Sequence, residues 1–442
     1  MKQNASPDVI LILYTTRYRE GGRKFDRAAR TMEAEKRIEH QDAEIRREPV
    51  ESKKEFVASL DRVRQKGGNI RELHFIGHSG MYGPMFGTTS WPEQFSPYEW
   101  RTLAIPFADE GQAWFHCCRS ARWFAPFFAR TFGVPVWGNH WYTSFSTRSD
   151  RFVPGLSSLK GSDRPLYVVG CPGRKSHGLF GSVQKYSGFM QAEDMKRFEP
   201  GPDVDATYDK VSPLYDEVFS DIRVRADEWR WLEPRIPQAG TARILDIGCG
   251  NGSLLRTLAD RFASGAGVDR SPGMIEKAEQ RCEGINNLSF QAIDGPFLPF
   301  PDRSFDIVIS LLSFRYLDWD PIMNEIRRVL APGGRFLVVD MVTAPVKPKE
   351  IPRFLSCKAR NYVQQRRNPR YREALRQMVA DPGWKTMLAF NPIRAEHELK
   401  WYLESRFPGR TVEVLNIGWS SRVLAFDSGP LDPGAVAPLT YP

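Results

Sequence analysis

Short apolar runs alternate with stretches of helical spacing along the first part of the chain. Apolar runs at residues 8–14, 72–77 and 166–170 predict buried strands. Residues 53–66 carry apolar side chains at helical spacing and end at two glycines, so they predict a helix between two of these strands. Strands that alternate with helices are typical of an α/β domain with a parallel sheet.

The second part begins its own alternation with a glycine-rich turn. Residues 243–255 read RILDIGCGNGSLL, in which an apolar run is followed by three alternate glycines and the start of a helix. Ligands bind at such turns in open α/β sheets, because glycine lets the backbone approach them. A dinucleotide fingerprint requires G-x-G-x-x-G, but Ser253 stands at the place of its third glycine. The spacing therefore indicates a nucleotide-type ligand other than NAD or FAD.

This turn resembles motif I of the class I S-adenosylmethionine (SAM) methyltransferases. The DIGCGNG segment carries the resemblance, which assigns cofactor binding to Asp246, Gly248, Gly250 and Gly252. LPFPDRSFDIV and, further on, VLAPGGRFLVVD are similar to later segments of that family and occur in the same order. The resemblance implies a Rossmann-like seven-stranded sheet and SAM as the cofactor.

Two further carboxylates follow predicted strands. Asp269 ends the apolar run of residues 265–269, where a carboxylate can accept hydrogen bonds from both hydroxyls of a ribose. Asp294 follows the next strand, and the family resemblance assigns it to the adenine amino group. Taken separately, each aspartate could instead be an ordinary helix cap or surface residue.

The acceptor side is marked less clearly. The segment SLLSFRY after the fourth strand differs from the N/D-P-P-Y type of signature, which argues against methylation of base amino groups. Arg315, Tyr316 and His397 are the candidate substrate-side residues. Tyr208 and Tyr215, in an amphipathic segment before the sheet, are candidates for covering the cofactor, with packing as the alternative.

Residues 346–410 are too many for a simple connection between the fifth strand and an apolar hairpin near residues 413–427, so they predict an inserted helical cap. The cap is rich in cations: Arg353, Lys358, Arg360, Arg366, Arg367, Arg370, Arg372 and Arg376. Such a run is usually a solvated helix face, and the alternative is docking of a carboxylate, a phosphate or a nucleic-acid backbone.

In the first part, His78 and Cys118 each follow an apolar run. A thiol becomes a nucleophile when a base or a following helix N-terminus favours its thiolate. The segments His78-Ser79-Gly80 and Cys118-Arg119-Ser120-Ala121 resemble those of caspase-like cysteine peptidases, especially their CHAT-type branches. The resemblance implies a smaller caspase-like α/β domain, with His78 as acid and base and Cys118 as nucleophile.

Other interpretations of this region remain open. Either cysteine of the pair Cys117-Cys118 could instead pack in a core. GHSGM approaches the nucleophile elbow of α/β-hydrolases, but Met81 replaces its last glycine. A zinc site built from His74, His78 and His116 with the cysteines lacks a recognisable ligand spacing.

The length of 442 residues predicts more than one domain. We expect a caspase-like α/β domain at residues 1–175, a linker at 176–200 and a methyltransferase domain at 201–442. With 41% hydrophobic and 26% charged residues and no long apolar run, the chain is expected to be globular, without a membrane partner or a cleaved leader. Its six cysteines suggest no disulfide framework, and hence a cytoplasmic protein.

The net charge of +9 is a mild excess for this length and makes nucleic acid a disfavoured partner. A small-molecule or peptide-like substrate is expected instead, without a metal, and the oligomeric state is open. Three hypotheses follow: both parts are enzymes, only the methyltransferase is active and the first part is a binding module, or the chain senses SAM without turnover.

Overall fold

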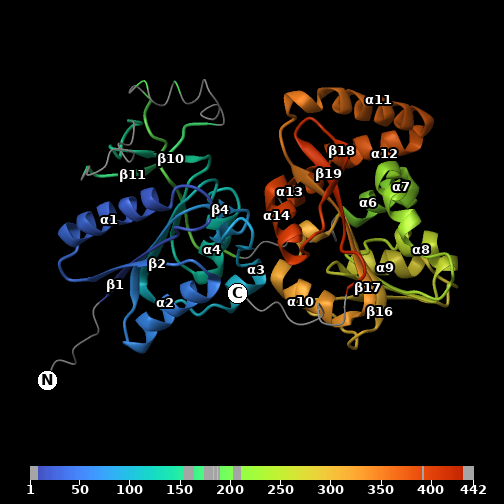
Figure 1. Ribbon diagram of the computed structural model, residues 1–442, viewed down its shortest axis with the longest axis horizontal. Coiled ribbons are helices and arrows are strands. Elements are labelled where there is room, and N and C mark those ends of the chain that lie inside the picture. The colour runs from blue at the N-terminus through green and yellow to red at the C-terminus, as the bar shows by residue number, and fades with distance from the viewer. Residues whose placement is uncertain are drawn as a thin grey trace. The chain divides into compact units, whose positions relative to one another are not determined.

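The computed structural model describes residues 8–153, 164–173, 183, 187, 190–202, 211–390 and 393–431; in the stretch 211–390 the side chains are described as far as residue 388. The chain divides into two compact units, Met1–Val204 and Asp205–Pro442, each with its own central sheet (Figure 1). The expected linker at residues 176–200 falls just before this division. The described helices include none that is long and apolar enough to cross a membrane.

The first unit is built on a six-stranded sheet. Its described strands lie in the order β12 (Lys196–Phe198), β9 (Val136–Gly138), β8 (Phe107–His116), β3 (Ile70–Ile76), β1 (Val9–Tyr14) and β2 (Glu44–Pro49). All neighbours are parallel except the pair of β12 and β9. Strand β12 lies inside the expected linker, where its three residues are too few to show an apolar alternation.

Helices cover both faces of this sheet. Alternate residues of a strand point to opposite faces, so Ile10 packs with Phe25 of α1 (Gly22–Glu39), and Leu11 packs in the cluster of Phe56 from α2 (Lys53–Gln65). Helices α3 (Pro97–Thr102) and α4 (Phe124–Phe132) join the cluster of α2 through Trp100 and Phe128. The resemblance of this α/β unit to the caspase-like fold stays a prediction.

Short ladders complete the first unit. The run at residues 166–170 forms β11 (Tyr167–Gly170), which pairs antiparallel with β10 (Thr143–Ser146) and not with the main sheet. Two further antiparallel pairs join β4 (Ser79–Gly80) with β5 (Gly83–Pro84) and β6 (Phe86–Gly87) with β7 (Pro92–Glu93). Both of these pairs lie in the segment between β3 and β8, directly after the carboxyl end of β3.

The second unit is built on a seven-stranded sheet. Its described strands lie in the order β15 (Leu288–Ala292), β14 (Ser264–Asp269), β13 (Arg243–Ile247), β16 (Phe305–Leu311), β17 (Leu330–Thr343), β19 (Ser421–Asp427) and β18 (Glu413–Ile417). The first five are parallel to one another. Strand β19 is antiparallel to its neighbours β17 and β18, so β18 runs in the same direction as the first five. The chain runs outward from β13 to β15 and then returns to β16. This reversal creates a switch point between the ends of β13 and β16, where α/β sheets bind ligands.

Helices also cover both faces of the second sheet. On one face, Leu255 of α8 (Ser253–Leu258) and Trp231 of α7 (Ala226–Leu232) pack on β13. On the other, Ile326 of α10 (Trp319–Val329) and Leu403 of α14 (Glu396–Arg406) close the core. Helix α9 (Pro272–Arg281) follows β14 and is capped by the Ser271 hydroxyl, which accepts from the Met274 N–H. Short 3₁₀ turns are η3 (Ile222–Val224), η4 (Glu233–Arg235), η5 (Ala259–Arg261), η6 (Phe314–Tyr316) and η7 (Pro348–Glu350).

The stretch expected to form a cap is helical. It contains α11 (Ile351–Arg367), α12 (Pro369–Ala380), α13 (Pro382–Phe390) and α14. Helix α12 packs against α6 (Ser212–Val218), where Ala374 and Met378 meet Val218 and Phe219. The segment before the sheet and the segment inserted after β17 therefore form one layer together.

Candidate functional site

The glycine loop turns sharply at the carboxyl end of β13. The backbone N–H groups of Gly248 and Cys249 both donate to the carbonyl of Val268, at 2.7 and 3.0 Å, which fastens the loop to β14. Gly248, Gly250 and Gly252 have φ angles of 76°, 53° and 72°, in the left-handed region that favours glycine. A Cβ on Gly248 would overlap the side chain of Ser313, whereas the nearest atom to a Cβ on Gly250 would be a Tyr215 ring carbon at 3.6 Å. The backbone is thus approachable at Gly250.

Asp269 lies directly beside this approachable backbone. Its Oδ2 accepts from the Gly250 N–H and its Oδ1 from the Ser271 N–H, each at 2.9 Å. Carboxylate oxygens are hydrogen-bond acceptors with about four acceptor positions in total, the chemistry that a ligand's hydroxyl groups require. The ribose-binding role of Asp269 stays a prediction.

Asp246 is buried beneath the loop with one carboxylate oxygen unsatisfied. Within the described residues its Oδ1 has no hydrogen-bond partner. Burial, and then the negative charge of Asp269, raise the pKa of Asp246 to about 8. An unsatisfied buried acceptor beside a second carboxylate suits a cationic, hydrogen-bonding ligand. The residues present therefore fit SAM, which carries a sulfonium and an ammonium group.

Asp294 lies at the same edge of the sheet. It follows β15, and the N–H of the preceding residue, Ile293, donates to the Asp269 carbonyl at 2.9 Å. The Asp294 side chain is exposed. The structure thus brings Asp246, the glycines, Asp269 and Asp294 to one edge of the sheet, while the adenine assignment of Asp294 stays a prediction.

Helix α6 is tethered to the glycine loop by residues that the sequence reasoning did not single out. The Asn251 side chain donates to Asp216 Oδ1 at 2.9 Å and to the Phe219 carbonyl at 3.1 Å. Arg281 forms an ion pair with Asp216. The tether places Tyr215 beside Gly250, with the ring of Trp384 6.5 Å from that of Tyr215. The position of Asn251 inside the glycine loop was the available signal, and Tyr208 lies outside the described residues.

The substrate-side candidates occupy different settings. Arg315 is buried, forms an ion pair with Asp340 through Nη1 and donates to the Tyr316 hydroxyl through Nη2 at 2.9 Å. Arg315 and Tyr316 are therefore brought together, with the guanidinium directed at the protein's own carboxylate. His397 lies on α14, and its ring centroid is 5.0 Å from that of Trp401.

In the first unit, His78 and Cys118 leave neighbouring strands at the same level. Ile76 of β3 is in register with His116 of β8, so the two candidates each stand two residues beyond this pair. The Ser79 hydroxyl donates to the Cys118 carbonyl. His78 Nε2 is 2.8 Å from the Glu20 carbonyl, and among the described residues no hydrogen bond joins His78 with Cys118.

The environments of the two adjacent cysteines differ. Cys117 is buried, and burial raises the pKa of its thiol to about 12. Cys118 is partly exposed, and its Sγ lies 3.3 Å from both the hydroxyl and the N–H of Thr143. Helix α4 begins only at Phe124, after a turn with Arg119 in the left-handed region, so the expected helix N-terminus beside Cys118 is absent from the structure.

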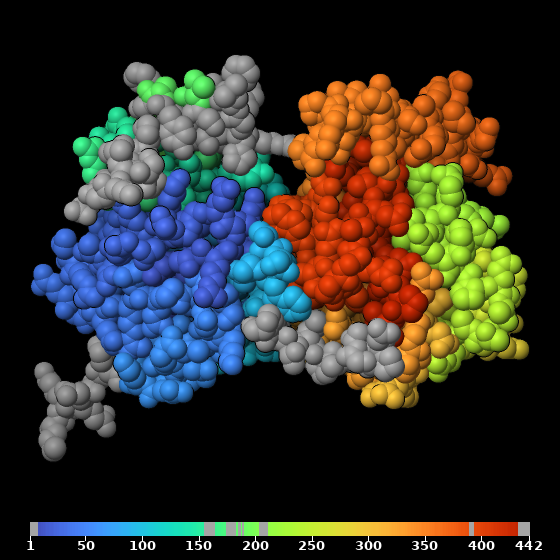
Figure 2. All heavy atoms as spheres, viewed as in Figure 1, coloured from blue at the N-terminus to red at the C-terminus, as the bar shows by residue number. Residues whose placement is uncertain are grey.

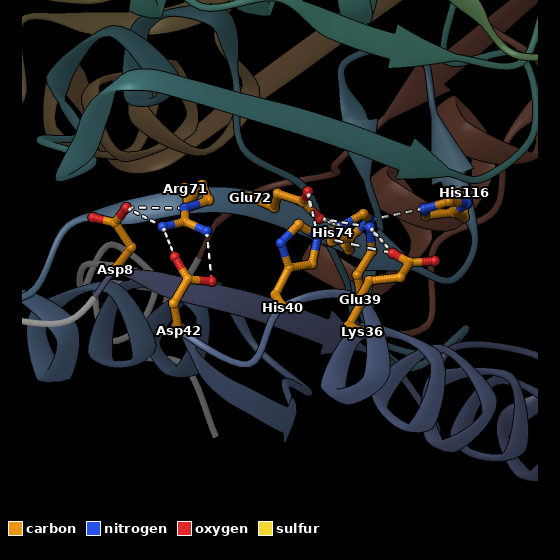
Figure 3. Close-up of polar contacts among 9 residues, drawn as sticks. All are labelled: Asp8, Lys36, Glu39, His40, Asp42, Arg71, Glu72, His74 and His116. Atoms are coloured by element: carbon orange, nitrogen blue, oxygen red, sulfur yellow. Dashed lines mark hydrogen bonds and ion pairs between the residues drawn. The ribbon is translucent and has the colours of Figure 1, made fainter.

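A buried polar cluster lies along the face of this sheet that α1 covers (Figure 3). His74 Nε2 is 2.8 Å from Glu72, and His74 Nδ1 is 3.1 Å from His116 Nε2. Lys36 of α1 pairs with Glu72 at 2.9 Å. Burial lowers the pKa of both His74 and His116. The described residues include no group of three or more His, Cys, Asp or Glu arranged to hold a metal ion.

The comparisons with known proteins concern the second unit. Residues 244–334 match the family described as a methyltransferase domain. The chain is 35% identical over 161 residues to demethylmenaquinone methyltransferase of Clavibacter sepedonicus, covering 36% of this chain and 64% of that protein. It is 29% identical over 177 residues to ubiquinone/menaquinone biosynthesis C-methyltransferase UbiE of Desulfotalea psychrophila, covering 37% and 69%.

Another curated relative and one solved structure are similar over different lengths. Sterol 4-C-methyltransferase strm-1 of Caenorhabditis elegans is 35% identical over 102 residues, covering 22% of this chain and 30% of that protein. A SAM-dependent methyltransferase structure from Aquifex aeolicus has a TM-score of 0.33 and 17% identity, covering 51% of this chain and 99% of that one. The matched family lies across the glycine loop and the strands beside it. Residues 244–334 are therefore similar to a methyltransferase domain, and the cofactor is S-adenosylmethionine. The chain spans less than two thirds of the length of the first of these relatives.

Proposed function

We propose that the second unit transfers the methyl group of SAM to a small, largely apolar acceptor. The observation that carries this proposal is the Gly250–Asp269 hydrogen bond beside the unsatisfied oxygen of Asp246, which together suit a cationic nucleoside. The names of the relatives specify quinone and sterol methylation. Those names favour an acceptor with a fused or aromatic ring and an apolar tail over a peptide-like acceptor.

The residues of this chain would act mainly by binding and orientation. SAM supplies an electrophilic methyl group on its sulfonium. Transfer of such a group is an in-line displacement, so the protein must align the acceptor and exclude water. Asp269 would hold the ribose, Asp246 would face the cationic end, and Tyr215 would cover Gly250. Because Arg315 is paired with Asp340, we assign it a positioning role in the loop after β16.

Calorimetry with SAM tests the cofactor site. Asp269→Ala removes an acceptor for hydroxyl groups, and each hydrogen bond to a charged group contributes about 1.5–3 kcal/mol. We expect at least a tenfold loss of affinity, while Asp260→Ala, at an exposed aspartate of η5, serves as the matched control. Unchanged binding by Asp269→Ala would refute the ribose assignment.

Methyl transfer itself is tested with labelled SAM and a panel of reduced demethylquinones, sterols and short peptides. We expect label in a ring-containing lipid, and its loss in Asp269→Ala. Label in peptides alone would overturn the acceptor class. Tight SAM binding without transfer to any acceptor would favour a sensor over an enzyme.

A second candidate function is thiol chemistry in the first unit. It is supported by the register of β3 and β8, which brings the His78 and Cys118 segments to one sheet edge, where Ser79 bonds to the Cys118 backbone. A base near a partly exposed thiol is the requirement for a cysteine nucleophile. The alternative is an inactive binding module.

Labelling by a thiol-directed peptidase probe separates these two interpretations. We expect labelling that Cys118→Ala abolishes, that Cys117→Ala preserves, and that His78→Ala slows. If Cys118 is labelled at the same rate in His78→Ala as in the native chain, Cys118 is an ordinary exposed thiol that His78 does not activate. No labelling of the native chain would favour the binding module.

A further inference from the structure

Helix α11 carries an apolar stripe on the side that faces solvent. Ile351, Leu355 and Tyr362 are 49%, 59% and 59% exposed, and Val363 at the edge of the stripe is 46% exposed. Offsets of four and eleven residues place the first three on one side of a helix. Trp419, in the turn between β18 and β19, is 75% exposed, and its ring is 5.5 Å from that of Phe354. We refer to Ile351, Leu355, Tyr362, Val363 and Trp419 as the α11 face.

This face is not needed to hold the helix in place. Buried Cys357 anchors the opposite side of α11, and buried Phe354, whose ring contacts Trp419, lies at the border of the α11 face. Arg353 donates to the Val414 carbonyl, and Gln364 donates to the Val224 carbonyl. With its inner side already packed, α11 leaves its outer apolar atoms uncovered, and Figure 2 shows the orange atoms of α11 along the outer edge of the second unit. Six of the nine exposed large hydrophobic side chains of the described residues lie on α11, α12 or the Trp419 turn.

The charged side chains of α11 itself have one sign. Helix α11 contains no Asp or Glu. Lys358, Arg366 and Arg367 are exposed, as are Arg370 and Arg372 at the start of α12. Within the described residues these five side chains have no ion pair, and two of them lie over rings of α11 itself: Lys358 over Phe354 and Arg366 over Tyr362. By contrast, Arg360 and Arg376 are paired with Asp227 and Glu373.

We propose that the α11 face docks on an anionic lipid surface, with its apolar side chains entering the headgroup region and the flanking cations contacting lipid phosphates. An exposed apolar stripe with cationic flanks is the pattern of a helix that lies in a membrane interface, and a tryptophan suits the same depth. Such docking requires no spanning helix. It places the helical layer that also covers the glycine loop, through α12 and α6, against the lipid.

Two other occupants fit the same face less well. A symmetric pair of copies would set the five cations of one chain against the same five of its partner. A nucleic-acid backbone would neutralise those cations but leave Ile351, Leu355 and Val363 in water. Lipid satisfies both the charges and the apolar side chains.

Sedimentation of the full chain with vesicles tests the proposal. We expect binding to vesicles of phosphatidylcholine mixed with phosphatidylglycerol, weaker binding to phosphatidylcholine alone, and partial weakening by salt. Leu355→Glu with Tyr362→Glu is expected to reduce binding tenfold or more. Ile38→Glu, at a 77% exposed isoleucine of α1, is the matched apolar control and is expected to bind as the native chain does.

A second pair of variants tests the contribution of the cations beside the α11 face. Arg366→Glu with Arg367→Glu is expected to remove the preference for anionic vesicles, whereas Lys54→Glu with Lys66→Glu in the first unit leaves it intact. No vesicle binding, or equal binding by the Leu355 and Tyr362 variant, would overturn the proposal. Dimerisation that this variant abolishes, without vesicle binding, would assign the face to a second copy. Asp269→Ala is expected to bind vesicles as the native chain does. The proposal for the cofactor site and the proposal for the α11 face can therefore be refuted independently.

Discussion

A Cβ atom on Gly248 would overlap the Cβ of Ser313, because the loop after β16 crosses directly over the first glycine of the loop after β13. Ser313 is held there by donating to the Ile247 carbonyl at 2.6 Å and by sharing a hydrogen bond with Ser310 at 2.8 Å. The loop on the cofactor side and the loop expected to face the acceptor are therefore packed against each other. We therefore expect a substitution in one loop to affect the other.

Gly248→Ala is expected to destabilise the second unit. The left-handed conformation costs an alanine about 1–2 kcal/mol, and the overlap with Ser313 adds to this cost. Gly250→Ala is the matched control, because its φ of 53° is also left-handed but the nearest atom to its Cβ is at 3.6 Å. Urea denaturation should show a clearly larger loss for Gly248→Ala, and equal losses would mean that the Ser313 contact is unimportant.

Protonation of Asp246 should couple to SAM binding. With a pKa raised to about 8, Asp246 carries a proton near neutral pH in the free protein. A cationic ligand favours the ionised carboxylate, so binding should release part of a proton and tighten as the pH rises from 6 toward 8. Calorimetry in buffers of different ionisation enthalpy measures this release.

Asp246→Asn provides the control for that measurement. The variant should bind SAM more weakly and without the proton release. The raised pKa also means that the folded protein binds this proton more tightly than the unfolded chain does. The stability that the proton contributes is fully present below the unfolded pKa of about 3.9 and is lost as the pH rises from there to about 8. Proton release that persists in Asp246→Asn would assign it to another group.

The cofactor side of the site could be predicted because its determinants are local in sequence. A strand, a glycine turn and a helix follow one another within residues 243–258, and Asp269 follows directly from the end of its strand. The role of Arg315 could not be predicted in this way. Its partner Asp340 lies on the neighbouring strand β17, and Arg394, buried over Trp319, also donates to the Arg315 carbonyl. Only the folded sheet and the helical layer bring these residues together.

The cationic run in the inserted helices was predicted as a solvated face or an anion-docking face. Counting charges did not reveal the apolar stripe of α11, because which side of a helix packs inward depends on the surrounding structure. Arg360 faces Asp227, while Tyr362 faces solvent. The first unit gives a similar example, since His74 and His116 come from different strands and only the pairing of β3 with β8 makes them neighbours.

The Asn251 tether should support SAM affinity without touching the cofactor. Asn251→Ala removes the hydrogen bonds to Asp216 and Phe219 that hold α6, and with it Tyr215, beside Gly250. We expect a loss of about 1–2 kcal/mol in stability and a several-fold loss of SAM affinity. Asn251→Asp should be worse, because it places two carboxylates together. Asn286→Ala, at an exposed asparagine, is the control. If calorimetry gives the same SAM affinity for Asn251→Ala and Asn286→Ala, the tether does not support cofactor binding.

The pair of His74 and His116 should make the first unit sensitive to mild acid. Burial lowers both pKa values below the unfolded value of about 6.5, so the unfolded chain binds more protons and stability falls as the pH drops below about 6.5. Each histidine contributes up to about 1.4 kcal/mol per pH unit. The pKa of Glu72, lowered to about 2, affects stability only at more acidic pH, below its unfolded value of about 4.3.

His116→Phe tests this dependence, because it removes one titrating group while filling a similar volume. If His74 donates from Nε2 to Glu72, its Nδ1 accepts the proton of His116 Nε2, so the variant also removes one hydrogen bond. We expect a lower stability at pH 7.5 but a shallower decline toward pH 5. Hydrogen exchange in urea, followed by mass spectrometry on peptides from β3 and β8, measures the stability of the first unit separately from that of the second. His40→Gln, at a partly exposed histidine, should leave the decline unchanged. A decline as steep in His116→Phe as in the native chain would show that the buried pair does not control it.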